Sequence, residues 1–172
     1  MTTTVLAHPA ARTVSVTVVG LLAAMALPFV VHAIPYSGSV PLGAQLLPIF
    51  YVGALLVARG QVVPALLIAL VAPWLNQQVT GMPAGPMLPT LTVELLVFTL
   101  LLLAAWRALP AALPYAAPVA YLVASVAARW LLSGEITTLT RLGATLENAW
   151  PGLLVLLVLG VLARPRRART HT

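Results

Sequence analysis

The chain has 172 residues, of which 61% are hydrophobic and only 7% are charged, and its mean hydropathy is +1.04. Soluble domains are about 45–50% apolar and about 25% charged, so this composition excludes a water-soluble globular protein. The chain has no cysteine, which excludes disulfides, thiolate metal sites and thiol redox chemistry. The net charge of +6 comes entirely from arginine, and in so apolar a chain the position of each arginine matters more than their sum.

Apolar runs separated by short polar turns predict an all-α integral membrane protein, organised as a bundle of six transmembrane helices in a single domain over residues 1–172. A span needs roughly 20 residues to cross about 30 Å of hydrocarbon at 1.5 Å per residue. Pro48 interrupts the second run, and a membrane helix tolerates such a proline where neighbouring helices satisfy the freed carbonyl. The predicted spans are residues 14–34, 41–58, 62–79, 88–106, 111–132 and 148–163.

Residues 133–147 are the one long segment that is not strongly apolar. Leu139, Leu142 and Leu146 recur in it at i, i+3 and i+7, which predicts a short amphipathic helix lying on the bundle. The sixth span follows it, with Pro151 well placed for the first turn.

The arginines predict the orientation. With six alternating spans, Arg12, Arg59, Arg107 and the basic tail at 164–172 fall on one side, and the loops of the opposite side carry only Arg141. Because cytoplasmic loops are enriched in Arg and Lys, both termini are predicted to be cytoplasmic, in a multi-pass protein of the cell membrane. The tail is interpreted as a topogenic signal and a contact for lipid phosphates, so no nucleic-acid partner is expected.

Polar side chains gather near the outer ends of the predicted spans, whereas the inner halves are mostly Leu, Val and Ala. An apolar pocket with a few placed polar groups is the usual form of a small-molecule site. The candidate substrate-binding residues are Tyr36, Gln45, Asn76, Glu94, Arg129, Trp130 and Asn148.

Glu94 and Arg129 are the two ionisable candidates within the bilayer. Such groups cost about 2.5–3.5 kcal/mol at a helix centre and usually face the bundle interior or a wet cavity. In one interpretation the two residues form a structural pair, or Arg129 snorkels to the surface. In the other, Arg129 binds a carboxylate or phosphate of the ligand and Glu94 accepts from a ligand donor. The Pro- and Gly-rich stretch 76–94 would then be a stiff wall of the site.

The remaining candidates have structural alternatives. Trp130 is expected in an aromatic belt at the interface, and Asn76 can cap its helix. His32 has no second histidine or carboxylate at ligand spacing, so no metal site or cofactor is predicted. Gly20 and Ala24 form a small-xxx-small pattern, which serves either packing within the bundle or contact with another membrane subunit.

Motifs of common enzymes are missing from the sequence. It contains no G-x-S-x-G, no H-E-x-x-H, no glycine-rich phosphate loop with a lysine, and only three carboxylates. We therefore predict no catalytic residues and no enzymatic activity.

The layout resembles the substrate-binding membrane subunit, or S component, of energy-coupling factor transporters. Residues 41–45 (PLGAQ), 75–83 (LNQQVTGMP) and 93–95 (VEL) are similar to sequences of that group. The resemblance implies a high-affinity binder of a vitamin or related micronutrient, with an outward pocket built from the loop after the first span and from spans four to six. It also implies that the first helix docks, through Gly20 and Ala24, on a coupling membrane subunit driven by two cytoplasmic ATPases. The rival hypothesis is a membrane scaffold or assembly subunit whose polar cluster is a protein interface.

Overall fold

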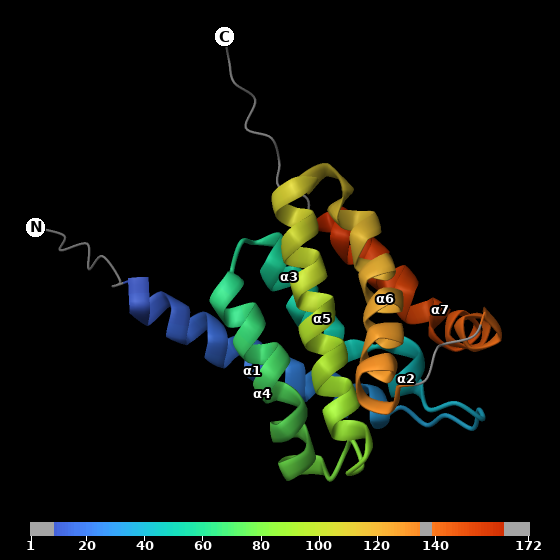
Figure 1. Ribbon diagram of the computed structural model, residues 1–172. Coiled ribbons are helices and arrows are strands. Elements are labelled where there is room, and N and C mark those ends of the chain that lie inside the picture. The colour runs from blue at the N-terminus through green and yellow to red at the C-terminus, as the bar shows by residue number, and fades with distance from the viewer. Residues whose placement is uncertain (1–8, 135–138, 164–172) are drawn as a thin grey trace, which may run out of the picture.

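The computed structural model describes residues 9–134 and 139–163, and within these ranges the chain is helical and has no strand. The basic tail lies outside the described residues. The helices form a bundle in which α4, α5 and α6 run side by side, while α1 and α7 cross the bundle obliquely (Figure 1). The elements are α1 (Pro9–His32), α2 (Leu42–Leu46), α3 (Pro48–Ala58), α4 (Val62–Thr80), α5 (Met87–Ala108), the 3-10 turn η1 (Pro110–Ala112), α6 (Leu113–Ser133) and α7 (Leu139–Leu162).

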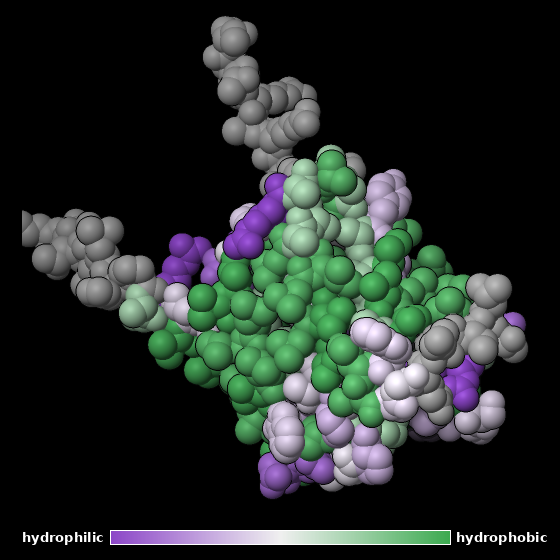
Figure 2. All heavy atoms as spheres, in the orientation of Figure 1, coloured by the Kyte–Doolittle hydropathy of each residue, from purple (hydrophilic) through white to green (hydrophobic). Residues whose placement is uncertain are grey.

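Five of these helices, α1, α4, α5, α6 and α7, are long and apolar enough to cross a membrane. Helices α2 and α3 form a shorter apolar stretch, Leu42–Ala58. Figure 2 shows apolar side chains over the middle of one face and hydrophilic ones toward its edges. Water does not favour so large an apolar surface, so these features indicate a multi-pass membrane protein.

The centre of the bundle is α3, which contacts α1, α4, α5 and α7. All but two of its eleven residues are buried, as expected for a helix that is apolar on every side. The ring of Phe50 packs edge-to-face on Phe98 of α5 and on Tyr121 of α6, with ring centroids 5.1 Å apart in both pairs. Such aromatic contacts have a defined geometry, so α3 fixes the relative position of α5 and α6.

Helix α6 presents alanines to its neighbours. Ala117, Ala120, Ala124 and Ala128 follow helical spacing and are all buried. Small side chains let helix backbones approach closely in a membrane protein, where van der Waals packing is a main source of helix association. This face allows α6 to pack against α5 on one side and α7 on the other.

The second predicted span, 41–58, is not one continuous helix. The chain breaks at Leu47, whose backbone is left-handed with φ 53° and ψ 40°, and α3 begins at Pro48. The residue before a proline disfavours the helical conformation, whereas proline itself suits the first position of a helix. The Tyr51 hydroxyl donates to the Leu46 carbonyl at the break, which satisfies a backbone group that the interrupted helix no longer pairs.

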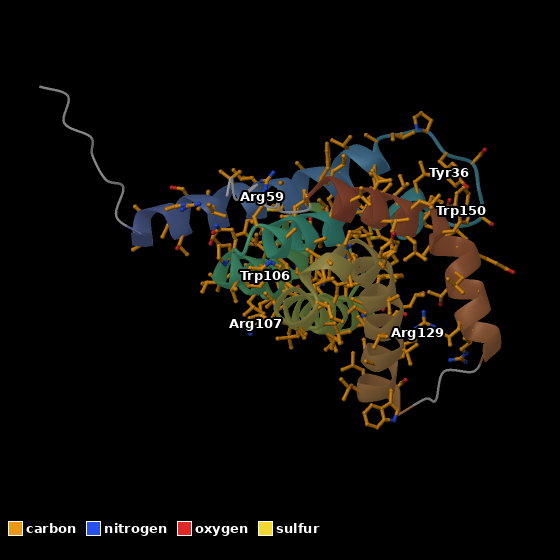
Figure 3. All side chains as sticks on the ribbon, turned by 90° about the horizontal axis from the view of Figure 1, so that it is seen from above. Tyr36, Arg59, Trp106, Arg107, Arg129 and Trp150 are labelled. Carbon is orange, nitrogen blue, oxygen red and sulfur yellow. The ribbon has the colours of Figure 1, made fainter. Side chains whose placement is uncertain are left out.

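The last predicted span, 148–163, also differs from the helix in the structure. We expected a helix over 148–163 with Pro151 in its first turn, preceded by a separate amphipathic helix, but α7 is one helix from Leu139 to Leu162. Pro151 lies in its interior, where it has no N–H for the carbonyl four residues earlier, and α7 bends there (Figure 3). The remaining predicted spans coincide with α1, α4, α5 and α6, with shifts only at the helix ends.

The bend of α7 packs on the break between α2 and α3, and this contact leads to a test. A Cβ at Gly152 would lie 2.7 Å from the Gln45 carbonyl oxygen and 2.8 Å from the Leu46 carbonyl carbon. Backbone atoms cannot move aside cheaply, so Gly152→Ala should destabilise the protein by about 1–3 kcal/mol. Gly143 of the same helix has nothing within 4 Å of such a Cβ, and Gly143→Ala should stabilise by up to about 1 kcal/mol.

The measurement is the thermal unfolding midpoint of both variants in one detergent. Equal shifts of the two unfolding midpoints would contradict the close contact between α7 and the α2–α3 break.

Candidate functional site

A cavity of about 400 Å³ opens between α6, the first half of α7 and the α1–α2 connection. Its volume is typical of small-molecule pockets, which measure roughly 300–1,000 Å³. The described residues that line it are Val40, Ala44, Tyr121, Arg129, Arg141, Ala144, Thr145, Asn148 and Ala149.

One face of α7 forms a wall of this cavity. Its lining residues Arg141, Ala144, Thr145, Asn148 and Ala149 follow at i, i+3, i+4, i+7 and i+8. This spacing places all five side chains on one side of a helix. The sequence prediction included Asn148 but missed Arg141 and Thr145, because it placed them in a separate amphipathic segment before the last span. The helical period of the polar residues across that boundary is the signal that identifies them.

Tyr121 and Arg129 line the opposite wall. They are eight residues apart on α6, so they lie on the same face two turns from each other. Arg129 is half-buried, and Figure 3 shows its side chain extending from α6 toward the first half of α7. Tyr121, which the sequence prediction missed, is only 8% exposed, and its ring is held in place by Phe50.

Glu94 of α5 lies behind this wall. It is half-buried, and it is close enough for its charge to act on both Arg129 and Tyr121. The structure describes both Glu94 and Arg129, and no direct ion pair joins them. The two residues are therefore electrostatic neighbours, with the Arg129 side chain lining the cavity.

Gln45 and Tyr36 support the wall formed by the α1–α2 connection. The Gln45 Nε2 atom donates to the Tyr36 hydroxyl and to the Val40 carbonyl, both at 2.9 Å. These bonds hold the connection that contributes Val40 to the lining and leads into α2, which contributes Ala44. Gln45 and Tyr36 thus lie next to the cavity without lining it.

Two predicted site residues lie elsewhere. Trp130 is 58% exposed on α6 and is not among the lining residues. Asn76 is buried between α4 and α1, where its Nδ2 atom donates to the Ala24 carbonyl at 3.3 Å. Asn76 therefore joins two helices of the bundle.

Gly20 and Ala24 are both buried on the side of α1 that faces α4. A Cβ at Gly20 would collide with the Cδ1 atom of Ile68 in α4. Within this chain the small-xxx-small pattern serves the close approach of α1 to α4. The opposite side of α1 is exposed and apolar, with Val19, Leu22 and Phe29 each at least 62% exposed.

The cavity combines two guanidinium groups, two hydroxyls and one amide with small apolar side chains. Such a site can bind a small polar molecule by charge and hydrogen bonds. Among the residues that the structure describes, no group of three or more His, Asp or Glu side chains could hold a metal ion.

No protein-family model, curated protein or solved structure matches this chain. The site is therefore interpreted from its own residues and geometry.

The bond from Asn76 to α1 predicts a structural role for this residue. Asn76→Ala should lower the free energy of unfolding by about 0.6–1.7 kcal/mol, as other hydrogen bonds between membrane helices do. The control is Gln78→Ala, because Gln78 is an exposed amide two residues further along α4. Thermal unfolding in detergent compares the two variants, and an equal effect of both would contradict the structural role of Asn76.

Proposed function

We propose that this chain is the membrane-embedded substrate-binding subunit of a micronutrient uptake transporter, which captures a vitamin or a precursor at the outer face of the cell membrane. The observation that carries the proposal is the polar cavity of about 400 Å³ within an otherwise apolar bundle. Its described walls come from the connection after α1, from α2, from α6 (the predicted fifth span) and from the first half of α7, which begins before the predicted sixth span. The S-component resemblance implies a pocket built from the loop after the first span and from spans four to six, and the cavity agrees with it except that no described lining residue comes from span four.

The proposed topology has six spans, with α2 and α3 together forming the second, and both termini in the cytoplasm. The distribution of arginine supports it. Figure 1 shows α5 and α6 running in opposite directions, so the last turn of α5, which holds Arg107, and the last turns of α6, which hold Arg129, lie at opposite ends of the bundle. Arg59 directly follows α3 and Arg107 lies in the last turn of α5, and both helices would end at the cytoplasmic face, in agreement with the positive-inside rule.

The proposed partners are a coupling membrane subunit and two cytoplasmic ATPases. The sequence has no glycine-rich phosphate loop with a lysine, so a partner would supply the energy for transport. In this proposal the chain itself binds and releases substrate, and it needs neither a cofactor nor a chemical step.

Ligand binding tests the proposal directly. A nutrient present at 100 times its dissociation constant stabilises the folded state by about 2.7 kcal/mol, so purified protein should unfold at a higher temperature in a screen of vitamins and precursors. Arg129→Ala and Glu94→Ala should lose this gain. Arg107→Ala, which removes an exposed arginine on the opposite side, should keep it. A broad screen without any stabilising compound would instead favour the membrane scaffold.

The proposed topology can be tested by labelling single cysteines, because the chain has no cysteine of its own. Single cysteines replace Ser39 in the α1–α2 connection and Ala108 at the end of α5, both of which are exposed. A membrane-impermeant maleimide should label Ser39→Cys in intact cells and Ala108→Cys only after permeabilisation. Labelling of both positions in intact cells would contradict a six-span chain with cytoplasmic termini.

A further inference from the structure

The charges around the cavity indicate the class of its ligand, an inference that rests on the proposed function. Arg129 projects from α6, and Arg141 lies on the facing wall in α7. Among the described lining residues none is acidic. Two guanidinium groups therefore line one cavity, and an anion inside it would be attracted to both.

The hydrogen-bonding groups of the α6 wall point to the same ligand. Neither the Arg129 guanidinium nor the Tyr121 hydroxyl has a hydrogen-bond partner among the described residues. Tyr121 is more than nine-tenths buried, and yet its side chain lines the cavity. Its hydroxyl is accessible from the cavity and has no partner among the residues that the structure describes, so it can donate to a molecule inside the cavity. A guanidinium fork beside a hydroxyl matches the oxygens of a carboxylate or phosphate.

Glu94 of α5 is a third ionisable residue close to Arg129 and Tyr121. Its charge acts on Arg129, and the two residues form no direct ion pair. In its ionised form Glu94 offsets part of the cost of holding a guanidinium within the bilayer, without occupying the donors of Arg129. The donors remain directed at the cavity, where an anionic ligand can accept from them.

We propose that the cavity selects a small organic anion, whose carboxylate or phosphate is bound by Arg129 and Tyr121 in the field of Arg141. The uncharged body of the ligand lies against Val40 and Ala149 and the alanines that also line the cavity. An oxyanion could equally belong to a lipid headgroup. The cavity of about 400 Å³ and the small apolar side chains of its lining suit a compact soluble nutrient better than an extended acyl chain, so a soluble anion is the ligand that we propose.

Matched pairs of compounds test the class of ligand. The full-length protein in a neutral detergent is titrated with nicotinate against nicotinamide, pantothenate against pantothenol, and pyridoxal phosphate against pyridoxal. The same pairing of each acid with its amide or ester extends to every compound found in the nutrient screen. The anionic member should bind at least about tenfold more tightly than its neutral partner, because charge-assisted hydrogen bonds are about twice as strong as neutral ones.

Two variants assign the preference to the α6 wall. Tyr121→Phe keeps the ring on Phe50 but removes the hydroxyl, and should weaken the anion about tenfold while leaving a neutral partner unaffected. Tyr115→Phe is the matched control, since Tyr115 lies on the same helix and is 64% exposed. Arg129→Gln should abolish the preference for the anion. The unfolding midpoint without ligand shows whether each variant is folded.

Three outcomes would overturn the inference, and they differ in what they leave standing. Equal binding of the neutral and anionic members refutes the anionic class but preserves a nutrient-binding subunit. A screen in which no compound binds refutes the proposed function together with this inference. In nanodiscs, stabilisation by phosphatidylglycerol over phosphatidylcholine, with loss of binding of the soluble anion, would show that a lipid headgroup occupies the site.

Discussion

The fold depends on backbone hydrogen bonds that a lipid environment cannot replace. An interrupted helix is tolerated at membrane depth only where protein covers the interruption or satisfies its free groups. The helical stretch 42–58 breaks at Leu47 and α7 bends at Pro151, and these two irregularities pack against each other through Gly152. The Tyr51 hydroxyl satisfies the Leu46 carbonyl at the same place. Each irregularity is thus covered by the other. The bend at Pro151 turns the first half of α7 toward α6, and the cavity forms between these two helices.

The centre of the bundle and the site share one residue. Tyr121 packs its ring on Phe50, which also holds Phe98, and it lines the cavity from α6. A hydroxyl on a ring fixed in this way loses little conformational freedom when it donates to a ligand. Preorganisation of the site therefore comes from the same edge-to-face contacts that order α3, α5 and α6.

Hydropathy alone predicts the helices that are regular. Helices α1, α4, α5 and α6 follow from apolar runs of sufficient length, and Pro48 marks the interruption of the second run, whereas the packing of α2 against α7 is contained in no local pattern. The site was predicted in part for the same reason. Arg129 and Asn148 are unusual in their surroundings and could be identified, but Tyr121 has the pattern of an ordinary core aromatic. Asn76 was also identified by its polarity, but its side chain bonds to α1 and is not among the described residues that line the cavity.

Arg129 costs stability wherever it lies within the bilayer, and the way in which the protein offsets that cost bears on function. A structural pair would bring a carboxylate into direct contact with the guanidinium and satisfy its donors. Here Glu94 acts on Arg129 without direct contact, and the guanidinium faces a cavity whose opposite wall carries Arg141. The donors of Arg129 are therefore left available on the cavity side, which a structural pair would not do.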